Sequence, residues 1–402
     1  MDGDFRHCTR EGSQLKDTTL IDKMEYSLAI ATLLVGLVYI HVGYPAIMAL
    51  LARVFPRRKG KDESEKVKLV SMVLCIHNEA SRLGARLDNL LSLECPVDRE
   101  IWVVCDGCED DSEALARAYG GEVVKVISWP SKRGKAAGLN AALEQVQGDV
   151  VVFCDVRQTF ESDVVVKFLE SLEDEEVGAV SGSLEIAASL AGGGKGMDVY
   201  WKLEKKLREW EGIFDASVGC TGAIYAIKRH LYAPIPEDTL LDDVVIPMSI
   251  AAKGKRVLFL RDARAFDPQT LAIDHEKRRK LRTLVGNYQM MFRYPNWIVP
   301  WRCRIWWQVI SHKYLRLAVP WILIAIAVLT IFGIGSPLVK LFAAGQGILY
   351  LLGFLGWRFP NLKHKVFTIP SAFLVLQWSC LSALITYLRF RNDFQRVWQK
   401  SR

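Results

Sequence analysis

Long apolar segments are the feature that most restricts how this chain of 402 residues can fold. The first is Tyr26–Leu51, and the C-terminal quarter adds Leu317–Gly335, Leu338–Gly356 and Val366–Leu388. Each has close to the ~20 apolar residues with which a helix crosses the hydrocarbon core of a bilayer. Lipid offers no partners to backbone N–H and C=O groups, so such segments must be helical. We therefore expect one N-terminal and about three C-terminal transmembrane helices.

Basic residues next to these segments predict their orientation. The cluster RVFPRRKGK, residues 53–61, directly follows the first span, and Lys and Arg favour the cytoplasmic side of a membrane. The chain beyond it should therefore be cytoplasmic, in an integral membrane protein. The basic loop 357–365 fits this arrangement. The basic tail 389–402 then falls on the outer side, so the side of the tail stays open.

The charge of the chain favours a membrane partner as well. The formal net charge is +7, and the positive excess lies near the apolar segments. This pattern predicts contact with anionic lipids and argues against a nucleic-acid partner. We expect residues 297–315 to form a separate segment. Its stretch Trp297–Tyr314 mixes Trp with Arg and Lys. Such a segment is typical of an amphipathic helix in the membrane interface, and an ordinary packing helix is the alternative.

The residues between the first span and residue 297 predict one soluble domain. A tail (1–25) precedes the first span (26–51), a basic linker (52–65) leads into the domain (66–296), and the C-terminal spans (316–388) precede the tail. Within the domain, apolar runs that indicate strands alternate with helical patterns; the runs are Leu69–Ile76, Ile101–Val104, 122–128 and 149–155. This alternation predicts an α/β fold with a mostly parallel sheet covered by helices on both faces.

Charged residues stand where the predicted strands end. Glu79 follows the first strand, Asp106 follows the second, and Asp155 closes the fourth, while Lys135 lies in a turn before a helix. Parallel sheets bind ligands at the carboxyl ends of their strands, although such acids also serve as helix N-caps. The chain contains neither a G-x-G-x-x-G nor a P-loop motif, so a dinucleotide or P-loop site is not supported.

The segment LLDDVVIP, residues 240–247, places Asp242 and Asp243 in apolar surroundings. Burying a carboxylate costs several kcal/mol unless a partner offsets it. The acids are therefore expected to face a cleft. For Asp242, capping of a helix is an equal alternative.

The order of these blocks resembles the family 2 glycosyltransferases, which have the GT-A nucleotide-sugar-binding fold. The matching blocks are VSMVLCIHNEA (70–80), VVCDGCEDDS (103–112), KRGKAAGLNAAL (132–143), VVFCDVRQTF (151–160), GCTGAIYAIKR (219–229), LLDDVVIP (240–247) and RRKLRTLVGNYQ (278–289). One span before the domain and several after it resemble the membrane-bound branch that synthesises polysaccharides.

The resemblance implies a donor site for a nucleotide-diphosphate sugar, expected to be a UDP-sugar. Glu79 and Asp106 would hold the nucleobase and ribose, and Lys135 would lie near the diphosphate. Asp155 matches the first acid of the D-x-D motif, which holds Mg²⁺ or Mn²⁺ on the diphosphate. The chain departs from that motif because Arg157 stands in the place of its second acid. One carboxylate ligand is therefore missing.

The resemblance also implies the catalytic groups. Asp243 matches the general base that takes the proton of the acceptor hydroxyl in an inverting transfer, and Asp242 adjoins it. Thr221 and Gly222 belong to a block at the acceptor end of the cleft, and Gln289 is expected there too. Arg282 would clamp the diphosphate.

Thr283 stands where processive synthases place a stacking tryptophan, so we expect transfer of one or a few sugars to a membrane-associated glycan or lipid-linked acceptor. Export or polymerisation partners would then complete the pathway. A processive synthase, a polyprenyl-phosphate monosaccharide transferase and a non-enzymatic nucleotide-sugar-binding subunit are the alternatives.

Overall fold

A computed structural model describes residues 25–57, 60, 66–186, 195–268, 273–359, 361–391, 393 and 394, without the side chains of 195–200 and 273–277. The chain divides into two compact units, which are described separately. One contains residues 1–45 and 315–382, and the other contains residues 46–314 and 383–402.

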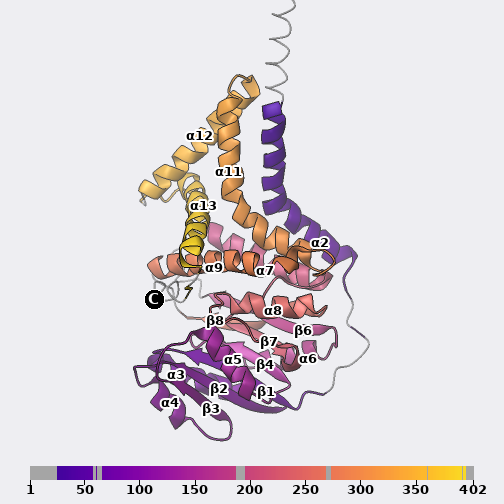
Figure 1. Cartoon of the computed structure of the whole chain (residues 1–402), viewed down its shortest axis with the longest axis vertical. Helices are drawn as coiled ribbons and strands as arrows, with labels where there is room; N and C mark the ends of the chain where they lie inside the picture. Colours follow the sequence, from indigo (N-terminus) through magenta and orange to yellow (C-terminus); the bar gives the residue numbers. More distant parts are fainter. Residues whose placement is uncertain are drawn as a thin grey trace, which may run out of the picture. The chain divides into compact units, whose positions relative to one another are not determined.

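The second unit is built on a mixed sheet, which has eight strands within the described residues (Figure 1). Their spatial order is β3-β2-β1-β4-β7-β6-β8-β5. The strands are β1 (Leu69–Ile76), β2 (Asp98–Asp106), β3 (Val124–Trp129), β4 (Val150–Cys154), β5 (Thr159–Phe160), β6 (Val177–Ile186), β7 (Ile224–Lys228) and β8 (Arg256–Asp267). The predicted strands correspond to β1 to β4, and the predicted limits of β1 agree with the structure.

The direction of the strands gathers their carboxyl ends. β1 is parallel to β2 and β4, and β2 is parallel to β3. β7 runs antiparallel to β4 and β6, whereas β6 and β8 are parallel to each other. The ends of β1, β2 and β4 therefore meet at one edge of the sheet, where the sequence places Glu79, Asp106 and Asp155.

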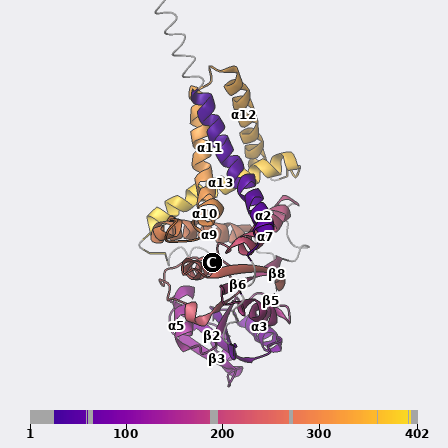
Figure 2. The same cartoon turned by 90° about the vertical axis from the view of Figure 1, so that its right-hand side faces the viewer.

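Helices cover both faces of this sheet because its strands are apolar on both sides. Residues of β1 alternate between two cores: Met72 and Leu74 pack in one, and Val73 in the other. The first core also contains apolar residues of α3 (Ala80–Ser92) and α6 (Val164–Leu172), and the second those of α5 (Lys135–Gln145) and α8 (Asp242–Ala252). Figure 2 shows α5 and α3 on opposite sides of the strands. The predicted fold class is confirmed.

Further helices complete this unit. They are α4 (Ser112–Ala118), α7 (Lys195–Phe214), α9 (Ile273–Arg293) and the short α10 (Trp306–Val309), with α2 (Tyr44–Val54) and α13 (Lys365–Phe390) each running on into the other unit. The other unit contains α11 (Leu315–Phe332) and α12 (Pro337–Arg358).

Within the described residues, four helical segments are long and apolar enough to cross a membrane: Glu25–Val54, Trp306–Phe332, Pro337–Arg358 and Lys365–Phe390. They correspond to the one N-terminal and three C-terminal spans that the sequence predicts. Large apolar side chains such as Leu341 and Trp378 remain exposed on them. Exposure of this kind is typical of helices that lipid surrounds.

The segment Trp297–Tyr314 is not the single amphipathic helix that its composition predicts. A 3₁₀ turn covers Pro295–Ile298, no regular helix follows up to Ile305, and a helix then begins at Trp306. Trp297 stacks on Tyr294, and Ile305 is fully buried. The aromatic residues therefore pack partly within the domain, which composition alone does not distinguish from packing on lipid.

A buried histidine joins this segment to α7. His312 lies in a π-helical turn, Ile310–Tyr314, and is fully buried. Its Nδ1 lies 2.8 Å from Glu211 Oε1, and its Nε2 lies 2.7 Å from Glu204 Oε1. Both ring nitrogens therefore hold the imidazole between two side chains of α7.

Replacing His312 with Leu should destabilise the protein by about 3–5 kcal/mol, because the buried Glu204 and Glu211 side chains would each lose a hydrogen-bond partner. Denaturant titration of the detergent-purified protein measures this loss. His230→Leu, at an exposed position, is the matched control and should change stability little. Equal stability of the two variants would contradict a stabilising role of the His312 contacts.

Candidate active site

The acidic pair begins helix α8. Asp242 and Asp243 form its first turn, where the positive end of the helix dipole stabilises carboxylates. Asp242 is buried, whereas Asp243 is half-buried. The prediction that both acids face a cleft therefore differs from the structure at Asp242. The following residues of α8 are apolar and pack in the core, which fixes the position of its first turn.

Lys135 is the cation that offsets the burial of Asp242. Its Nζ lies 3.2 Å from Asp242 Oδ2 and donates to Asp155 Oδ1 at 3.1 Å. Burial alone would lower the pKa of Lys135, but the carboxylates of Asp155, Asp242 and Asp243 outweigh it and raise this pKa well above its usual value. The end of β4 and the beginnings of α5 and α8 therefore meet at one ammonium group.

Asp243 has the electrostatic character of a proton acceptor. Burial and the neighbouring Asp242 carboxylate raise its pKa, while Lys135 and Arg208 act in the opposite direction. A carboxylate with a raised pKa accepts a proton more readily at neutral pH than an ordinary aspartate does. Four residues from three of the predicted blocks, Lys135, Asp155, Asp242 and Asp243, are thus brought together.

The segment Gly219–Gly222 lies directly against Asp243. The Cys220 amide donates to the Asp243 carbonyl at 2.8 Å, and the Thr221 amide donates to Ser181 Oγ at the same distance. A Cβ on Gly222 would lie 2.8 Å from Asp243 Oδ2, which is closer than a Cβ atom normally comes to another heavy atom. Only glycine therefore leaves the carboxylate in its place, which explains the small residues of this block.

Two side chains of helix α9 belong to this region: Arg282 contributes a guanidinium, and Gln289 holds a loop in place. Burial lowers the pKa of the Arg282 guanidinium. The carboxylates of Asp242, Asp243 and Asp155 act in the opposite direction, with a smaller effect. Gln289 accepts from the Leu240 amide and donates to the Asp238 carbonyl. Its amide therefore holds the loop that leads into the acidic pair, and its predicted contact with an acceptor stays a prediction.

Of the two acids predicted to bind the nucleoside, Glu79 follows β1 and Asp106 is the last residue of β2. Asp106 accepts from the amides of Arg133 and Gly134 at 2.6 and 3.0 Å, which fixes the turn before Lys135. Gly134 has φ +102°, a conformation that favours glycine. Glu79 is the N-cap residue of α3 and pairs with Arg82 at 2.7 Å. Both acids thus also stabilise local structure.

The residues around Asp155 do not fit the divalent ion that the sequence resemblance implies. Within the described residues, no group of three His, Cys, Asp or Glu side chains is placed to hold a metal ion. Asp155 Oδ1 already accepts a hydrogen bond from the Lys135 ammonium. Arg157, in the place of the second acid, pairs with Asp267 at 3.4 Å. Mg²⁺ and Mn²⁺ need several oxygen ligands, whereas the carboxylates of Asp155 and Asp242 already share the Lys135 ammonium.

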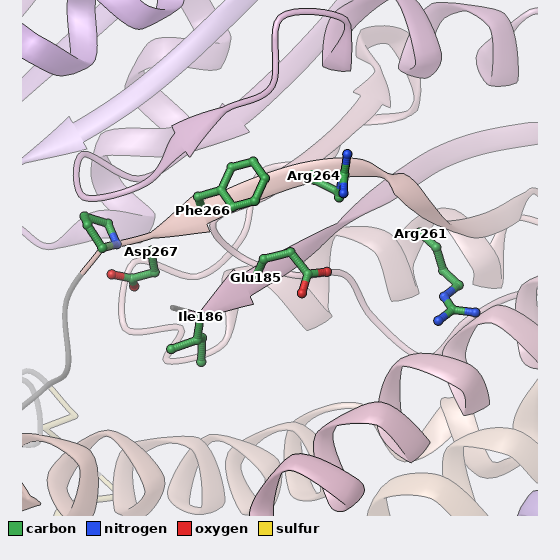
Figure 3. Close-up of a pocket in the computed structure, with 7 residues that line it drawn as sticks. Glu185, Ile186, Arg261, Arg264, Phe266 and Asp267 are labelled. Atoms are coloured by element: carbon green, nitrogen blue, oxygen red, sulfur yellow. The ribbon is translucent and has the colours of Figure 1, made fainter. Parts of the chain in front are cut away.

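A hollow of about 570 Å³ adjoins this group of residues (Figure 3). Its lining consists of Glu185, Ile186, Arg261, Arg264, Phe266, Asp267 and Pro268. It therefore lies along the ends of β6 and β8, and Asp267 connects it to Arg157. None of the residues predicted for donor binding or catalysis belongs to the lining.

Sequence reasoning missed three polar residues of this region. Arg208, on α7, acts on Asp243 and lies 3.5 Å from Thr221 Oγ1 through its Nη1. Ser181, on β6, bonds with the Thr221 amide. Asp267 ends β8 and partners Arg157. They lie 13 to 110 positions from these partners in the chain, and no local motif marks them.

Comparison with known proteins identifies the type of domain. Residues 71–230 match the family model described as glycosyl transferase family 2. The chain is 28% identical over 128 residues to the poly-beta-1,6-N-acetyl-D-glucosamine synthase of Staphylococcus epidermidis, covering 31% of each protein. It is 28% identical over 144 residues to the beta-monoglucosyldiacylglycerol synthase of Trichormus variabilis, covering 35% of this chain and 30% of that one. The match thus spans about a third of the length of these curated relatives.

The fold has a counterpart among solved structures. The mannosyltransferase PcManGT from Pyrobaculum calidifontis, solved in complex with GDP-Man and Mn²⁺, superposes with a TM-score of 0.65 and 22% sequence identity. The superposition covers 89% of this chain and 99% of that one. At this identity the likeness concerns the fold.

Proposed function

We propose that this chain, which carries a glycosyl transferase family 2 domain with the GT-A fold, is an inverting glycosyltransferase. It moves a sugar from a nucleotide-diphosphate sugar, a UDP-sugar in the first instance, to a hydroxyl group of a membrane-associated glycan or lipid-linked acceptor. The catalytic domain works on the cytoplasmic side of a bacterial inner membrane in contact with membrane lipids. Export or polymerisation of the product is left to partner proteins.

The observation that supports the proposal most directly is the surroundings of Asp243. Its carboxylate has a raised pKa, lies against Gly222, and adjoins the Lys135 group at the carboxyl end of β4. A base must stand beside the acceptor hydroxyl, and the leaving diphosphate must stand near positive charge. The site offers both within one group of side chains.

The proposed step follows from these positions. The acceptor oxygen attacks the anomeric carbon of the donor sugar while Asp243 takes the hydroxyl proton. The bond between that carbon and the diphosphate oxygen breaks, and its electron pair leaves with the nucleoside diphosphate. Attack opposite the leaving group inverts the anomeric configuration. Thr221 and Gly222 border the place of the acceptor beside Asp243.

The donor is held by residues on the same edge of the sheet. Glu79 and Asp106 lie where the nucleoside would bind, and Lys135 and Arg282 provide positive charge for the diphosphate. The fixed turn at Arg133 and Gly134, which Asp106 holds, keeps Lys135 in position before the donor arrives. Such preorganisation avoids a reorganisation cost during the reaction.

Mn²⁺ is present with the donor in the structural neighbour PcManGT. The expected Mg²⁺ or Mn²⁺ of this chain would have Asp155 as its carboxylate ligand. Because that carboxylate is paired with Lys135 and Arg157 stands in the place of the second acid of the motif, no step of the proposal runs through an ion.

Release of nucleoside diphosphate tests the function. Purified protein in detergent or lipid is incubated with UDP-glucose, UDP-N-acetylglucosamine or GDP-mannose and a lipid extract as acceptor source. Acceptor-dependent release from one donor supports glycosyl transfer. Binding of nucleoside diphosphates without release from any donor would favour the non-enzymatic alternative.

The pH dependence should reflect the Asp242–Asp243 pair. Asp243 acts as a base only when deprotonated, and its raised pKa places the acid limb of kcat/KM above the ~3.9 of an ordinary aspartate. Asp242→Asn removes the like charge, so the pKa of Asp243 should fall and the limb should move to lower pH. Rates between pH 4 and 9, at constant ionic strength, measure the shift. If the acid limb did not move, Asp242 would not influence the pKa of the base.

The product should carry one or a few added sugars. Thr283 is exposed on α9 and its hydroxyl donates to the Arg279 carbonyl, so it offers little apolar surface for a stacked sugar. The acceptor should therefore leave between transfers. Sizing products at low conversion, with donor in large excess over acceptor, decides the point. Long polymer beside untouched acceptor would instead support the processive synthase alternative.

A further inference from the structure

We propose that Lys135 and Arg157 neutralise the leaving diphosphate in place of a divalent ion, and that Asp267 holds Arg157 in position. This inference rests on the proposed function, because it concerns the leaving group of the same reaction. It assigns a role to Arg157, which interrupts the acidic motif, and to Asp267, which lies 110 positions later in the chain.

Arg157 is positioned by a buried carboxylate. Its Nη2 donates to Asp267 Oδ2 at 3.4 Å, and Gln158 Nε2 donates to the same oxygen at 2.8 Å. The Asp267 side chain is 5% exposed and that of Arg157 is 23% exposed. The carboxylate is thus fixed inside the domain, while part of the Arg157 side chain remains exposed.

The guanidinium retains donors for a ligand. A guanidinium has five N–H donors in a rigid planar fork. In the part of the chain that the structure describes, Arg157 donates one hydrogen bond, to Asp267. Guanidinium groups bind phosphate oxygens through two parallel N–H donors. Arg157 therefore can hold Asp267 and a phosphate oxygen at the same time.

Positive charge already surrounds the carboxylate that a metal ion would need. The Lys135 ammonium lies 3.1 Å from Asp155 Oδ1. Arg157 and Arg279 also act electrostatically on Asp155. A divalent cation would have to share this carboxylate with the ammonium and approach two guanidinium groups. Coulomb repulsion disfavours that arrangement.

The same cations fit the charge that the reaction creates. When the bond between the anomeric carbon and the diphosphate breaks, its electron pair stays on the leaving oxygen. Fixed Lys and Arg groups stabilise such developing charge without reorganising. The proton of the acceptor goes to Asp243, so Lys135 and Arg157 keep their own protons throughout.

Binding of UDP and GDP tests the inference directly and does not require turnover. Calorimetric titration of the detergent-purified full chain is carried out in excess EDTA and again with Mn²⁺. Equal affinity for the same nucleotide in both conditions is the expected result. Loss of binding in EDTA with recovery in Mn²⁺ would overturn the inference while leaving the proposed function intact.

Variants of Arg157 identify the cation. Arg157→Gln should weaken UDP or GDP binding by about tenfold or more, since a charge-assisted contact is lost, and should leave the monophosphates nearly unaffected. Arg157→Lys keeps the charge and should retain most of the affinity, which separates charge from folding. Arg229→Gln, at an exposed position near the start of β4, where its side chain donates to the Gly148 carbonyl, is the matched control. Unchanged affinity in Arg157→Gln would overturn the assignment.

Arg157→Asp completes the acidic motif and should make nucleotide binding respond to Mn²⁺. The wild-type chain should show no such response. If no nucleoside diphosphate binds to the folded wild-type protein in either condition, the proposed function fails and this inference fails with it.

Discussion

Asp243→Asn is expected to reduce turnover by roughly 10²–10⁴-fold, the usual contribution of a general base. The amide has almost the shape of the carboxylate but cannot take the proton of the acceptor hydroxyl. The backbone contact between Cys220 and the Asp243 carbonyl does not involve the side chain and should persist. Acceptor-dependent release of nucleoside diphosphate under single-turnover conditions measures the loss.

Two controls make this result specific. Affinity for UDP or GDP should remain close to that of the wild type, because the substitution does not alter Lys135 or Arg157. Asp98→Asn lies at the exposed, opposite end of β2 and should keep full activity. An Asp243→Asn protein with near-normal, acceptor-dependent turnover would exclude Asp243 as the base.

Gly222→Ala is expected to lower turnover by about 10²-fold, because a displacement of ~1 Å at a reacting group has effects of this size. The new Cβ would lie 2.8 Å from Asp243 Oδ2 and 3.1 Å from Asp243 Cβ. The carboxylate must therefore move, while its chemical identity stays the same. The single-turnover assay used for Asp243→Asn measures the loss.

The position of Gly222 allows a strict comparison. Gly121→Ala places its Cβ in open space with no atom within 4 Å, so its turnover and stability should match the wild type. The Gly222→Ala protein should unfold at nearly the wild-type denaturant concentration, since a side-chain end can shift at small cost. Wild-type turnover in Gly222→Ala would show that the position of this carboxylate does not limit the reaction.

The sequence by itself determined the elements whose signal is local. An apolar run of eight residues defined β1 because a strand buried on both faces must be apolar throughout, and its limits agree with Leu69–Ile76. The four candidate spans were evident from their length and hydropathy, because a helix that crosses a bilayer must be apolar over ~20 residues. The order of the blocks between them sufficed to predict the GT-A fold, whereas the roles assigned to the site residues stay predictions.

Tertiary structure alone decided how those residues pair. Lys135 reaches Asp155 and Asp242 across 20 and 107 positions, so no spacing rule could show that one ammonium bridges them. In the sequence, Arg157 stands where the motif has a second metal-binding acid. Its partner Asp267 lies beside it only because strand β8 pairs with β5 in the sheet. Likewise, Trp297–Tyr314 has the composition of an interfacial helix, yet it folds as a turn, an irregular stretch and the beginning of another helix. Composition records which groups are present, whereas burial and charge pairing depend on which distant segments the sheet brings beside them.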